Sequence, residues 1–300
     1  TIASVGDATD FGDMTESKNL VSPAASPTRA VLGGGSTPSR SNVIEFFEFG
    51  TSGTAQDFGD LVTATGGMYG LSSHTRGVFA GGQTPSNTNV IQYVTMAGKS
   101  DETDFGDLSA ARTTGVGLSN LTRGVFAGGA EGARVDTCEY ITIATTGNPT
   151  DFGNLTVDRY LLGGCSNGHG GLEAFDPRLI SLGSGRAIVG GGSSPGGSDD
   201  LNIMEYFNIN NLGNTVDFGD LVKSVQTMAA SGSHTRGIFA GGKDPGNLND
   251  IQSVEIHSLG NAADFGDLTA SRGNMQRGTS NRTRGLAAAG STPSYSDIVD

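Results

Sequence analysis

Short apolar runs alternate with polar turn clusters along the whole chain. The run RGVFAGG at Arg123–Gly129 places apolar side chains on both faces of an extended strand, which is typical of a strand covered on two sides. The run NVIQYVTM at Asn89–Met96 is rich in β-branched and aromatic residues, as strands are. Turn clusters such as QTPSNT separate these runs. No window has sustained helical periodicity, so the pattern predicts an all-β protein.

The same pattern returns at a fixed period. The triplet Asp-Phe-Gly occurs six times, with gaps of 47, 47, 47, 66 and 47 residues, and an arginine before an apolar strand recurs in phase with it. The triplets begin at Asp10, Asp57, Asp104, Asp151, Asp217 and Asp264, and the arginines are Arg29, Arg76, Arg123, Arg186, Arg236 and Arg284. A fixed period of this length indicates a repeat architecture.

Each unit contains four short segments suited to strands. The stretches DFGDLSAAR (Asp104–Arg112) and TTGVGLSN (Thr113–Asn120) complete the set begun by the two runs above. Four strands per unit, six times over, predict one six-bladed β-propeller across residues 1–300. The innermost strands of such a ring crowd its axis, which explains why the chain needs many of its 49 glycines.

The two ends of the chain belong to one unit. The first residues, TIASVGDATDFGD, align with TIATTGNPTDFGN at Thr142–Asn154, and Asp300 aligns with Gln92 or Glu139. These offsets leave about two strand residues absent between the end and the start. We therefore expect the N-terminus to supply the outer strand of the blade that the C-terminus begins, which closes the ring and hides its edges. Because the chain begins with Thr1, we also expect a processed or trimmed piece of a longer polypeptide.

The markers of each unit resemble the Kelch repeat. Double glycines follow an apolar strand, and a tyrosine lies in the next strand. These residues are Gly81-Gly82, Gly128-Gly129, Gly191-Gly192, Gly241-Gly242, Tyr93 and Tyr140. Two departures are the phenylalanine of the triplet where Kelch units carry tryptophan, and Ala289-Gly290 in the last unit. The resemblance covers nearly the whole chain and implies four-stranded Kelch-like blades.

The units also resemble those of repeat proteins encoded by marine bacteriophages, notably phages of cyanobacteria. That resemblance implies a virion or extracellular location and a tail-fibre or adhesin-type role. The partners it implies are a host cell-surface glycan or protein, or a neighbouring virion protein. A cellular Kelch-type interaction domain stays open as an alternative.

Composition disfavours several classes of partner. A net charge of −13 and a pI near 4.6 disfavour binding to nucleic acid and to anionic membranes. No apolar run approaches the ~20 residues of a membrane span, so we expect no membrane insertion. Cys138 and Cys165 lie in neighbouring units without a motif, and we expect two free, buried thiols.

The triplet itself invites a catalytic interpretation, because protein kinases use Asp-Phe-Gly to bind magnesium. The Gly-rich loop, strand lysine and His-Arg-Asp loop of a kinase are missing from the sequence. A calcium loop would need alternating oxygen ligands that DFGDL does not provide. We interpret the triplet as a structural anchor, in which Phe58 and Phe105 pack between blades while Asp57 and Asp104 accept backbone N–H bonds.

The repeated arginines admit two interpretations. A ring of cations around the axis would hold an anion. Alternatively, each forked guanidinium joins a carboxylate or carbonyl of its own or the adjacent blade. Since every unit carries one Arg and one Asp, we predict that these arginines, among them Arg76, Arg123 and Arg236, pair structurally with the repeated aspartates.

The sequence has no motif for catalysis, a metal or a cofactor. The four histidines and two cysteines lack metal-ligand spacing, and the glycine runs are not followed by the Lys-Ser or Lys-Thr of a phosphate loop. We therefore expect a non-catalytic binding or structural module without a cofactor. A propeller enzyme acting on glycans at the axial mouth is the alternative.

One unit breaks the symmetry. Its gap is 19 residues longer than the others, and most of the excess falls in a loop at approximately residues 167–185. Inserted loops on a rigid scaffold often carry binding, although a packing or decorative loop is an equal alternative. The candidate ligand-binding residues of this loop are His169, Glu173, Phe175, Asp176 and Arg178.

Overall fold

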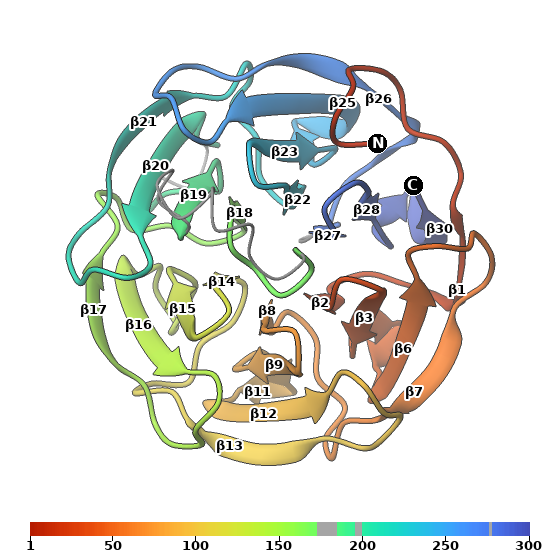
Figure 1. The fold of residues 1–300 in the computed structure, drawn as a ribbon, viewed down its shortest axis with the longest axis vertical. Coiled ribbons are helices and arrows are strands. Elements are labelled where there is room, and N and C mark those ends of the chain that lie inside the picture. Colours follow the sequence, from red (N-terminus) through yellow and green to blue (C-terminus); the bar gives the residue numbers. More distant parts are fainter. Residues whose placement is uncertain (173–184, 196–199, 276–277) are drawn as a thin grey trace.

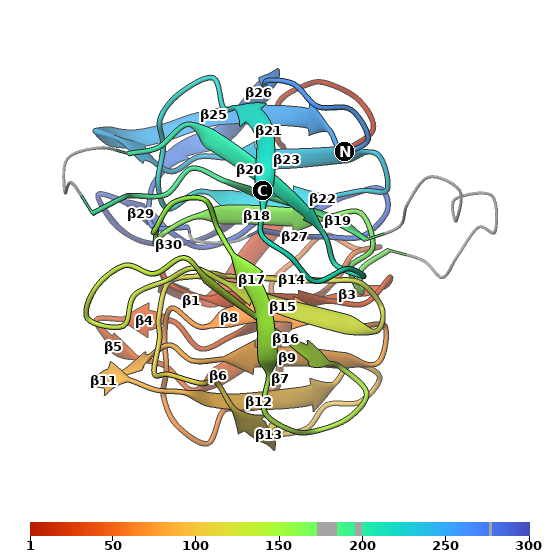
Figure 2. The same ribbon diagram turned by 90° about the vertical axis from the view of Figure 1, so that its left-hand side faces the viewer.

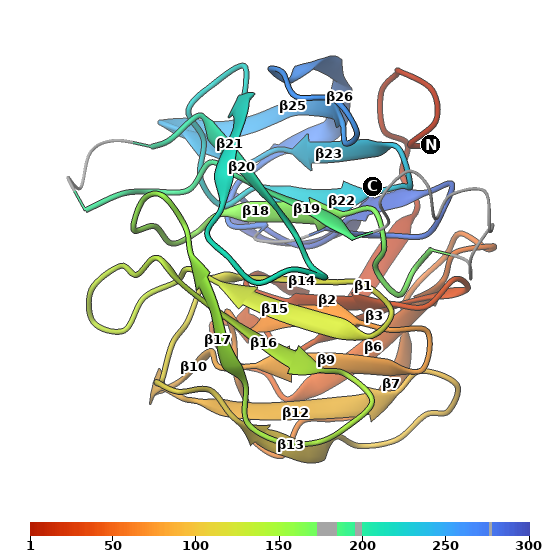
Figure 3. The same ribbon diagram turned by 60° about the vertical axis from the view of Figure 1, so that its left-hand side comes forward.

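The computed structural model describes residues 1–172, 185–195, 200–275 and 278–300. They form antiparallel sheets arranged as a ring around a central axis, with each sheet extending from the axis to the circumference (Figure 1). Both chain ends lie on the same side of the ring, near β26 and β30 (Figures 1 and 3).

Five sheets contain four main strands each, and the chain is therefore an all-β propeller of antiparallel blades. From the axis outward, the first blade consists of β2 (Ser22–Ala25), β3 (Arg29–Gly33), β6 (Val43–Glu48) and β7 (Gln56–Asp60). The second consists of β8 (Tyr69–Ser72), β9 (Arg76–Ala80), β12 (Val90–Thr95) and β13 (Thr103–Asp107). The third consists of β14 (Val116–Ser119), β15 (Arg123–Ala127), β16 (Thr137–Thr142) and β17 (Thr150–Asn154). The fourth consists of β18 (Gly163–Ser166), β19 (Arg186–Gly190), β20 (Ile203–Asn208) and β21 (Val216–Asp220). The fifth consists of β22 (Ala229–Gly232), β23 (Arg236–Ala240), β25 (Gly246–Glu255) and β26 (Ala263–Arg272).

Short hairpins project from one face of the ring, at the left of Figure 2. They arise from the STPS-like turn clusters that separate the second and third strands of a unit. They are β4 (Ser36–Thr37) with β5 (Ser39–Arg40), β10 (Gln83–Thr84) with β11 (Ser86–Asn87), and β24 (Lys243–Asp244) with the start of β25.

The chain ends meet as predicted. The remaining strands are β1 (Gly12–Lys18), β27 (Gly278–Ser280), β28 (Gly285–Ala287), β29 (Ser291–Thr292) and β30 (Ser294–Val299). The N-terminal strand β1 pairs with β30, with Gly12 opposite Val299, and β27 pairs with β28. A bridge between Ala288 and Val299 links β28 to β30. The pairing of the first and last strands joins the two ends of the chain and covers the edge of β30 with β1.

The Asp-Phe-Gly triplet forms a β-bulge in the outermost strand. In the second blade Ile91 pairs with Gly106, but the next residue, Gln92, pairs with Asp104. Phe105 is therefore the extra residue of the bulge, and its ring is buried. The same register shift occurs in the other four blades. A bulge re-aims a side chain, which explains why the triplet recurs once per blade.

Apolar side chains of neighbouring blades form the core between them. Phe105 of the second blade lies in one buried cluster with Phe126 and Ile141 of the third. Near the axis the blades come so close that a Cβ added at Gly117 would lie 2.4 Å from the carbonyl oxygen of Gly70. This contact requires the small residues expected on the innermost strands.

Candidate functional site

The innermost strands surround a channel along the axis of the ring. Serine side chains join these strands to one another. Ser119 Oγ donates to the carbonyl of Ser72 (2.8 Å), Ser166 Oγ to that of Ser119 (2.6 Å), and Ser280 Oγ to that of Gly232 (2.8 Å). The cavity left at the axis is about 60 Å³, far below the roughly 300–1,000 Å³ of ordinary ligand pockets.

The start of the insertion at approximately residues 167–185 occupies one end of this channel. The backbone N–H of Gly170 donates to the carbonyl of Ser72 in β8 at 3.1 Å. A Cβ added at Gly171 would lie 1.8 Å from the carbonyl oxygen of Ser280 in β27. The inserted chain therefore leaves the fourth blade and crosses the axis, and only glycine fits where it touches the far strands.

His169 fixes the inserted segment on the axis. Its Nε2 lies 2.8 Å from the carbonyl oxygen of Gly232 and 3.2 Å from Ser280 Oγ, while its Nδ1 accepts a hydrogen bond from the N–H of Gly171 at 3.1 Å. A carbonyl partner requires a proton on Nε2, and an N–H partner requires a lone pair on Nδ1. The surroundings thus select the neutral Nε2–H tautomer and occupy both ring nitrogens.

Burial is the main cause that lowers the pKa of His169 to about 4; the hydrogen bond to Gly232 opposes this shift, and the neighbouring His234 and His74 add to it. The ring is neutral at pH 7. Because both nitrogens already have backbone partners, the arrangement suits a structural plug and not proton transfer or metal binding.

Of the residues predicted in the insertion, His169 falls within the described part of the chain. Glu173, Phe175, Asp176 and Arg178 lie outside the described residues. The structure instead adds His74, whose Nε2 is 2.5 Å from the carbonyl oxygen of Leu172. The sequence offered one signal for this contact, since His74 and His234 occupy equivalent positions in SHTRG and His169 lies in the insertion.

The repeated arginines join neighbouring blades. Each donates from Nη1 to a backbone carbonyl of the next unit around the ring. The pairs are Arg29–Met96, Arg76–Ile143, Arg123–Ile209, Arg186–Ile256, Arg236–Ile2 and Arg284–Phe49. Arg76 and Arg123 also stack over Tyr93 and Tyr140, at 4.3 and 4.4 Å from the ring centroids. These arginines therefore face carbonyls between blades and not an anion at the axis.

The predicted Arg–Asp pairing is wrong in the described part of the chain. The carboxylates paired with these arginines there are Glu48, beside Arg29, and Glu255, beside Arg236. The Asp of the triplet is exposed in every unit. The reason is the bulge, which turns the phenylalanine inward and leaves the preceding aspartate on the outer surface.

Asp57 and Asp104 of the triplet were also predicted to accept backbone N–H bonds, and the described hydrogen bonds do not include such contacts. The outer strand is capped instead by the loop of the next unit, where Asp101 Oδ1 accepts from the N–H of Asp60 and Asn148 Oδ1 from that of Asp107, at 3.1 and 3.0 Å. Phe58 and Phe105 are buried between blades, at 1% and 2% exposure.

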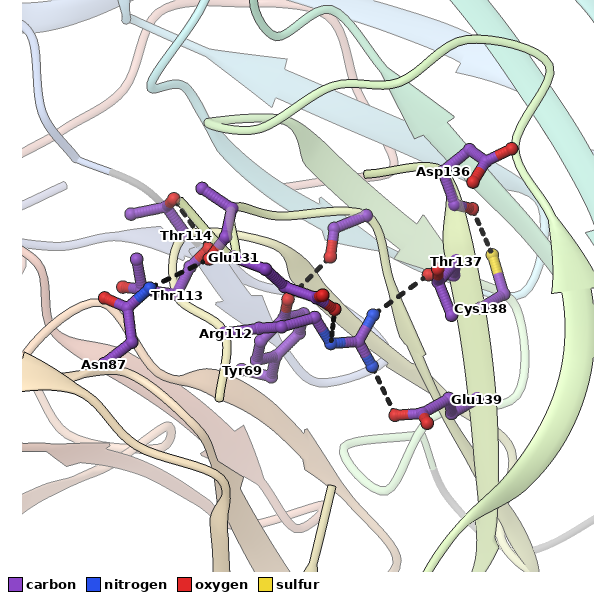
Figure 4. A network of polar contacts seen from close by, with 12 residues as sticks. Tyr69, Asn87, Arg112, Thr113, Thr114, Glu131, Asp136, Thr137, Cys138 and Glu139 are labelled. Atoms are coloured by element: carbon purple, nitrogen blue, oxygen red, sulfur yellow. Dashed lines mark hydrogen bonds and ion pairs between the residues drawn. The ribbon is translucent and has the colours of Figure 1, made fainter. Parts of the chain in front are cut away.

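Buried ion pairs that connect one blade to the next are the main feature that sequence reasoning missed. The described residues contain Lys18–Glu45, Arg112–Glu139, Arg159–Glu205 and Arg272–Asp300. Figure 4 shows the network between the second and third blades, where Arg112 is fully buried, contacts Glu139, donates to the carbonyl of Thr137 (3.3 Å) and lies 3.5 Å from Glu131. Loss of either partner would leave the other charge buried without compensation, so both residues of each pair must be kept together.

A sequence signal for these pairs exists. A glutamate stands in the middle of an apolar strand in VIEFF and TCEYI, where an unpaired charge would be costly. In the second and fifth blades the same position holds Gln92 or Gln252, and the cation is replaced by Thr65 or Val225. Each contact between blades therefore has either both the acidic and the basic residue of the pair or neither of them.

The two cysteines are free and buried, as expected. Burial raises the pKa of both the Cys138 and the Cys165 thiols to about 12. A thiol that stays protonated at neutral pH is a poor nucleophile and metal ligand, so both act as packing residues.

A scan of protein-family models and a search of curated proteins found no match to this chain. Within the described residues, no three His, Cys, Asp or Glu side chains are grouped so that they could hold a metal ion. The described part of the chain also has no helix with the length and apolar character of a membrane span.

Proposed function

We propose that this chain is a six-bladed, Kelch-like propeller that acts as a non-catalytic binding and structural module on a phage particle. The sixth blade would consist of β27, β28, β30 and β1. Two contacts that recur in the other blades are also present in this sheet and support its assignment as a sixth blade. The Arg272–Asp300 pair repeats Arg112–Glu139, and the Arg284–Phe49 bond repeats the tie between blades.

The observation that carries the proposal is the filled axis. The backbone of residues 170–171 and the His169 ring occupy the channel end at which a propeller would otherwise offer a concave pocket. Recognition is then left to the rims and the outer surface. Short loops on a rigid scaffold are well suited to such contacts.

The distribution of charge supports the same function. The exposed triplet aspartates form an acidic circumference, whereas the hairpin face carries polar ties such as the bond from Asn87 Nδ2 to the carbonyl of Ala130 (3.0 Å). An acidic circumference repels polyanions and keeps the particle surface soluble. The proposed partners are a host surface glycan or protein, or a neighbouring virion protein.

Two measurements test this function. Antibody against the propeller, visualised by immunogold on intact particles, should label the virion. The purified chain should bind host cells or a glycan array without releasing reducing ends. Glycan cleavage would overturn the non-catalytic role, and failure both to label particles and to bind any of these surfaces would overturn the binding role.

A further inference from the structure

Six equivalent residues encircle the channel on the hairpin face of the ring. Each lies shortly before an innermost strand and has a left-handed backbone, with φ between 53° and 70°. We call them the mouth ring: Leu20, Gly67, Thr114, Leu161, Thr227 and Asn274. Gly66, beside Gly67, bridges to Gln83 of the hairpin β10–β11, whereas the carbonyl of Ser72 at the far end of β8 accepts the hydrogen bond from the inserted segment. The mouth ring and the inserted segment therefore lie at opposite ends of the channel.

Backbone hydrogen bonds join members of the mouth ring to one another. The N–H of Gly67 donates to the carbonyl of Leu20, and that of Thr114 to the carbonyl of Gly67 (both 2.9 Å). The N–H of Leu161 donates to Thr114, and that of Thr227 to Leu161 (both 2.8 Å). Leu20 and Leu161 are thus three places apart in the mouth ring. The strands that follow them, β2 and β18, lie on opposite sides of the axis (Figure 1), so the two leucines flank the mouth from opposite sides.

Leucine is a costly residue at these two positions. A left-handed backbone strains a residue with a bulky side chain, whereas glycine, as at Gly67, or asparagine, as at Asn274, adopts it readily. Leu20 and Leu161 are half-exposed, and they lie outside the buried clusters formed by the described residues. Half-exposed aliphatic side chains held in strained positions indicate a role in contact with another molecule.

Two arginines beside the mouth ring have no carboxylate partner in the described part of the chain. Arg134 lies over the ring of Tyr160, 4.6 Å from its centroid. Arg40 donates to Gln83 and lies beside Gly66, where an added Cβ would be 2.9 Å from its Nη1. Tyr160 and Gly66 each immediately precede a member of the mouth ring. Since neither arginine forms an ion pair with a described residue, two positive charges border the mouth on a chain whose net charge is −13.

The chemistry of the mouth fits an acidic peptide with an aliphatic residue. Aliphatic side chains gain free energy by burying another aliphatic group, and guanidinium groups bind carboxylates. A saccharide would set hydroxyl groups against the leucines, where they would lose their hydrogen bonds to water without a replacement. Asp200, hydrogen-bonded to Gln226 beside Thr227, places negative charge elsewhere on the rim, so the carboxylates of a partner are directed to the arginines.

We propose that the mouth ring is a docking site for an exposed acidic loop or chain end of a partner protein. An aliphatic side chain of the partner enters between Leu20 and Leu161, and the flanking carboxylates pair with Arg40 and Arg134. This inference rests on the binding role proposed above and names the class of partner for it.

The probe is the capped peptide Ac-Glu-Leu-Glu-NH2, titrated into the folded chain by calorimetry, with Ac-Lys-Leu-Lys-NH2 and Ac-Glu-Asn-Glu-NH2 as matched controls. The probe should bind with one peptide per chain. Each control should bind at least tenfold more weakly, because the first loses the charge match and the second loses the aliphatic contact. Net charge alone predicts the opposite order for the lysine peptide, since the chain as a whole is acidic. Equal binding of the three peptides, or no binding of the probe, would overturn the proposal.

Leu20→Asn and Leu161→Asn locate the site and separate docking from folding. Asparagine tolerates the left-handed backbone, as at Asn274, so each variant should keep or raise Tm while its affinity for the probe falls at least tenfold. A fall in Tm of several degrees in both variants would show that the leucines serve the fold, and unchanged binding would exclude them from the site. Val62→Asn is the control for surface apolarity, since Val62 is 84% exposed after the outer strand β7, and it should bind the probe as the parent chain does.

Failure of this inference is distinguishable from failure of the proposed function. If the chain binds host cells or a glycan array but not the probe, the mouth ring is not the docking site and the binding role stands. A glycan that competes with the probe would place a saccharide at the mouth and overturn the assignment of a protein partner. Absence of binding to the probe and to every one of those surfaces would overturn both.

Discussion

Arg123 Nη1 lies 2.9 Å from the carbonyl oxygen of Ile209, so a single guanidinium joins the third blade to the fourth. The same side chain covers the ring of Tyr140. We predict that Arg123→Met lowers the free energy of unfolding by about 2 kcal/mol, through loss of a charge-assisted hydrogen bond and a cation–π contact. Urea denaturation measures this loss. The matched control is Asp104→Asn on the exposed circumference, which should change stability by less than about 0.5 kcal/mol, and an Arg123→Met protein as stable as the control would contradict the role of the tie.

The buried pair of Arg112 and Glu139 predicts strong coupling between the two residues. Arg112→Met alone leaves a buried carboxylate without its cation and should cost about 3–5 kcal/mol. The double variant Arg112→Met, Glu139→Gln should recover much of that loss, because the second and fifth blades already have a glutamine at the acidic position and an uncharged residue at the basic one. A double-mutant cycle by chemical denaturation measures the coupling, and additive effects would show that the charges do not interact.

His169 predicts a dependence of stability on pH. Its folded pKa of about 4 lies below the ordinary value of about 6.5, so the unfolded chain binds this proton more readily than the folded one. The contribution is therefore complete above about pH 6.5, and it is lost as the pH falls from there to about 4, by up to about 3 kcal/mol.

The control for this pH effect is His169→Gln, whose side chain keeps a donor for the carbonyl of Gly232 but does not titrate. As the pH falls from 6.5 to 4, the wild-type protein should lose stability relative to the His169→Gln variant, so that the difference between their unfolding free energies shrinks. Parallel stability curves over that window would mean that the ring does not stay neutral in the folded state.

Close approach at the axis predicts a severe effect of adding a methyl group at Gly117. Gly117→Ala would place Cβ 2.4 Å from the Gly70 carbonyl oxygen, and the innermost strands would have to separate. We expect a loss of more than about 2 kcal/mol, measured by thermal unfolding. Gly98→Ala is the matched control, since its added Cβ has no atom within 4 Å and should leave Tm nearly unchanged.

The repeat period by itself determined much of this protein. The spacing of Phe58 and Phe105 indicated the length of one unit, the four strand-like segments in it predicted four strands per blade, and the alignment of Asp300 with Glu139 predicted the pairing of the two chain ends. These features follow from the sequence because each blade forms its contacts with local, regularly spaced segments, and so the same residues recur at the same offsets.

The tertiary structure decided how the polar groups are partnered. Arg123 finds a carbonyl of the next blade and not an aspartate of its own, because the bulge at Phe105 turns the triplet aspartate outward. His169 leaves its own blade, and Gly232 of β22 and Ser280 of β27 supply its partners. Such contacts depend on how blades converge around the axis, and a period along the chain specifies which residues are equivalent but not which of them meet.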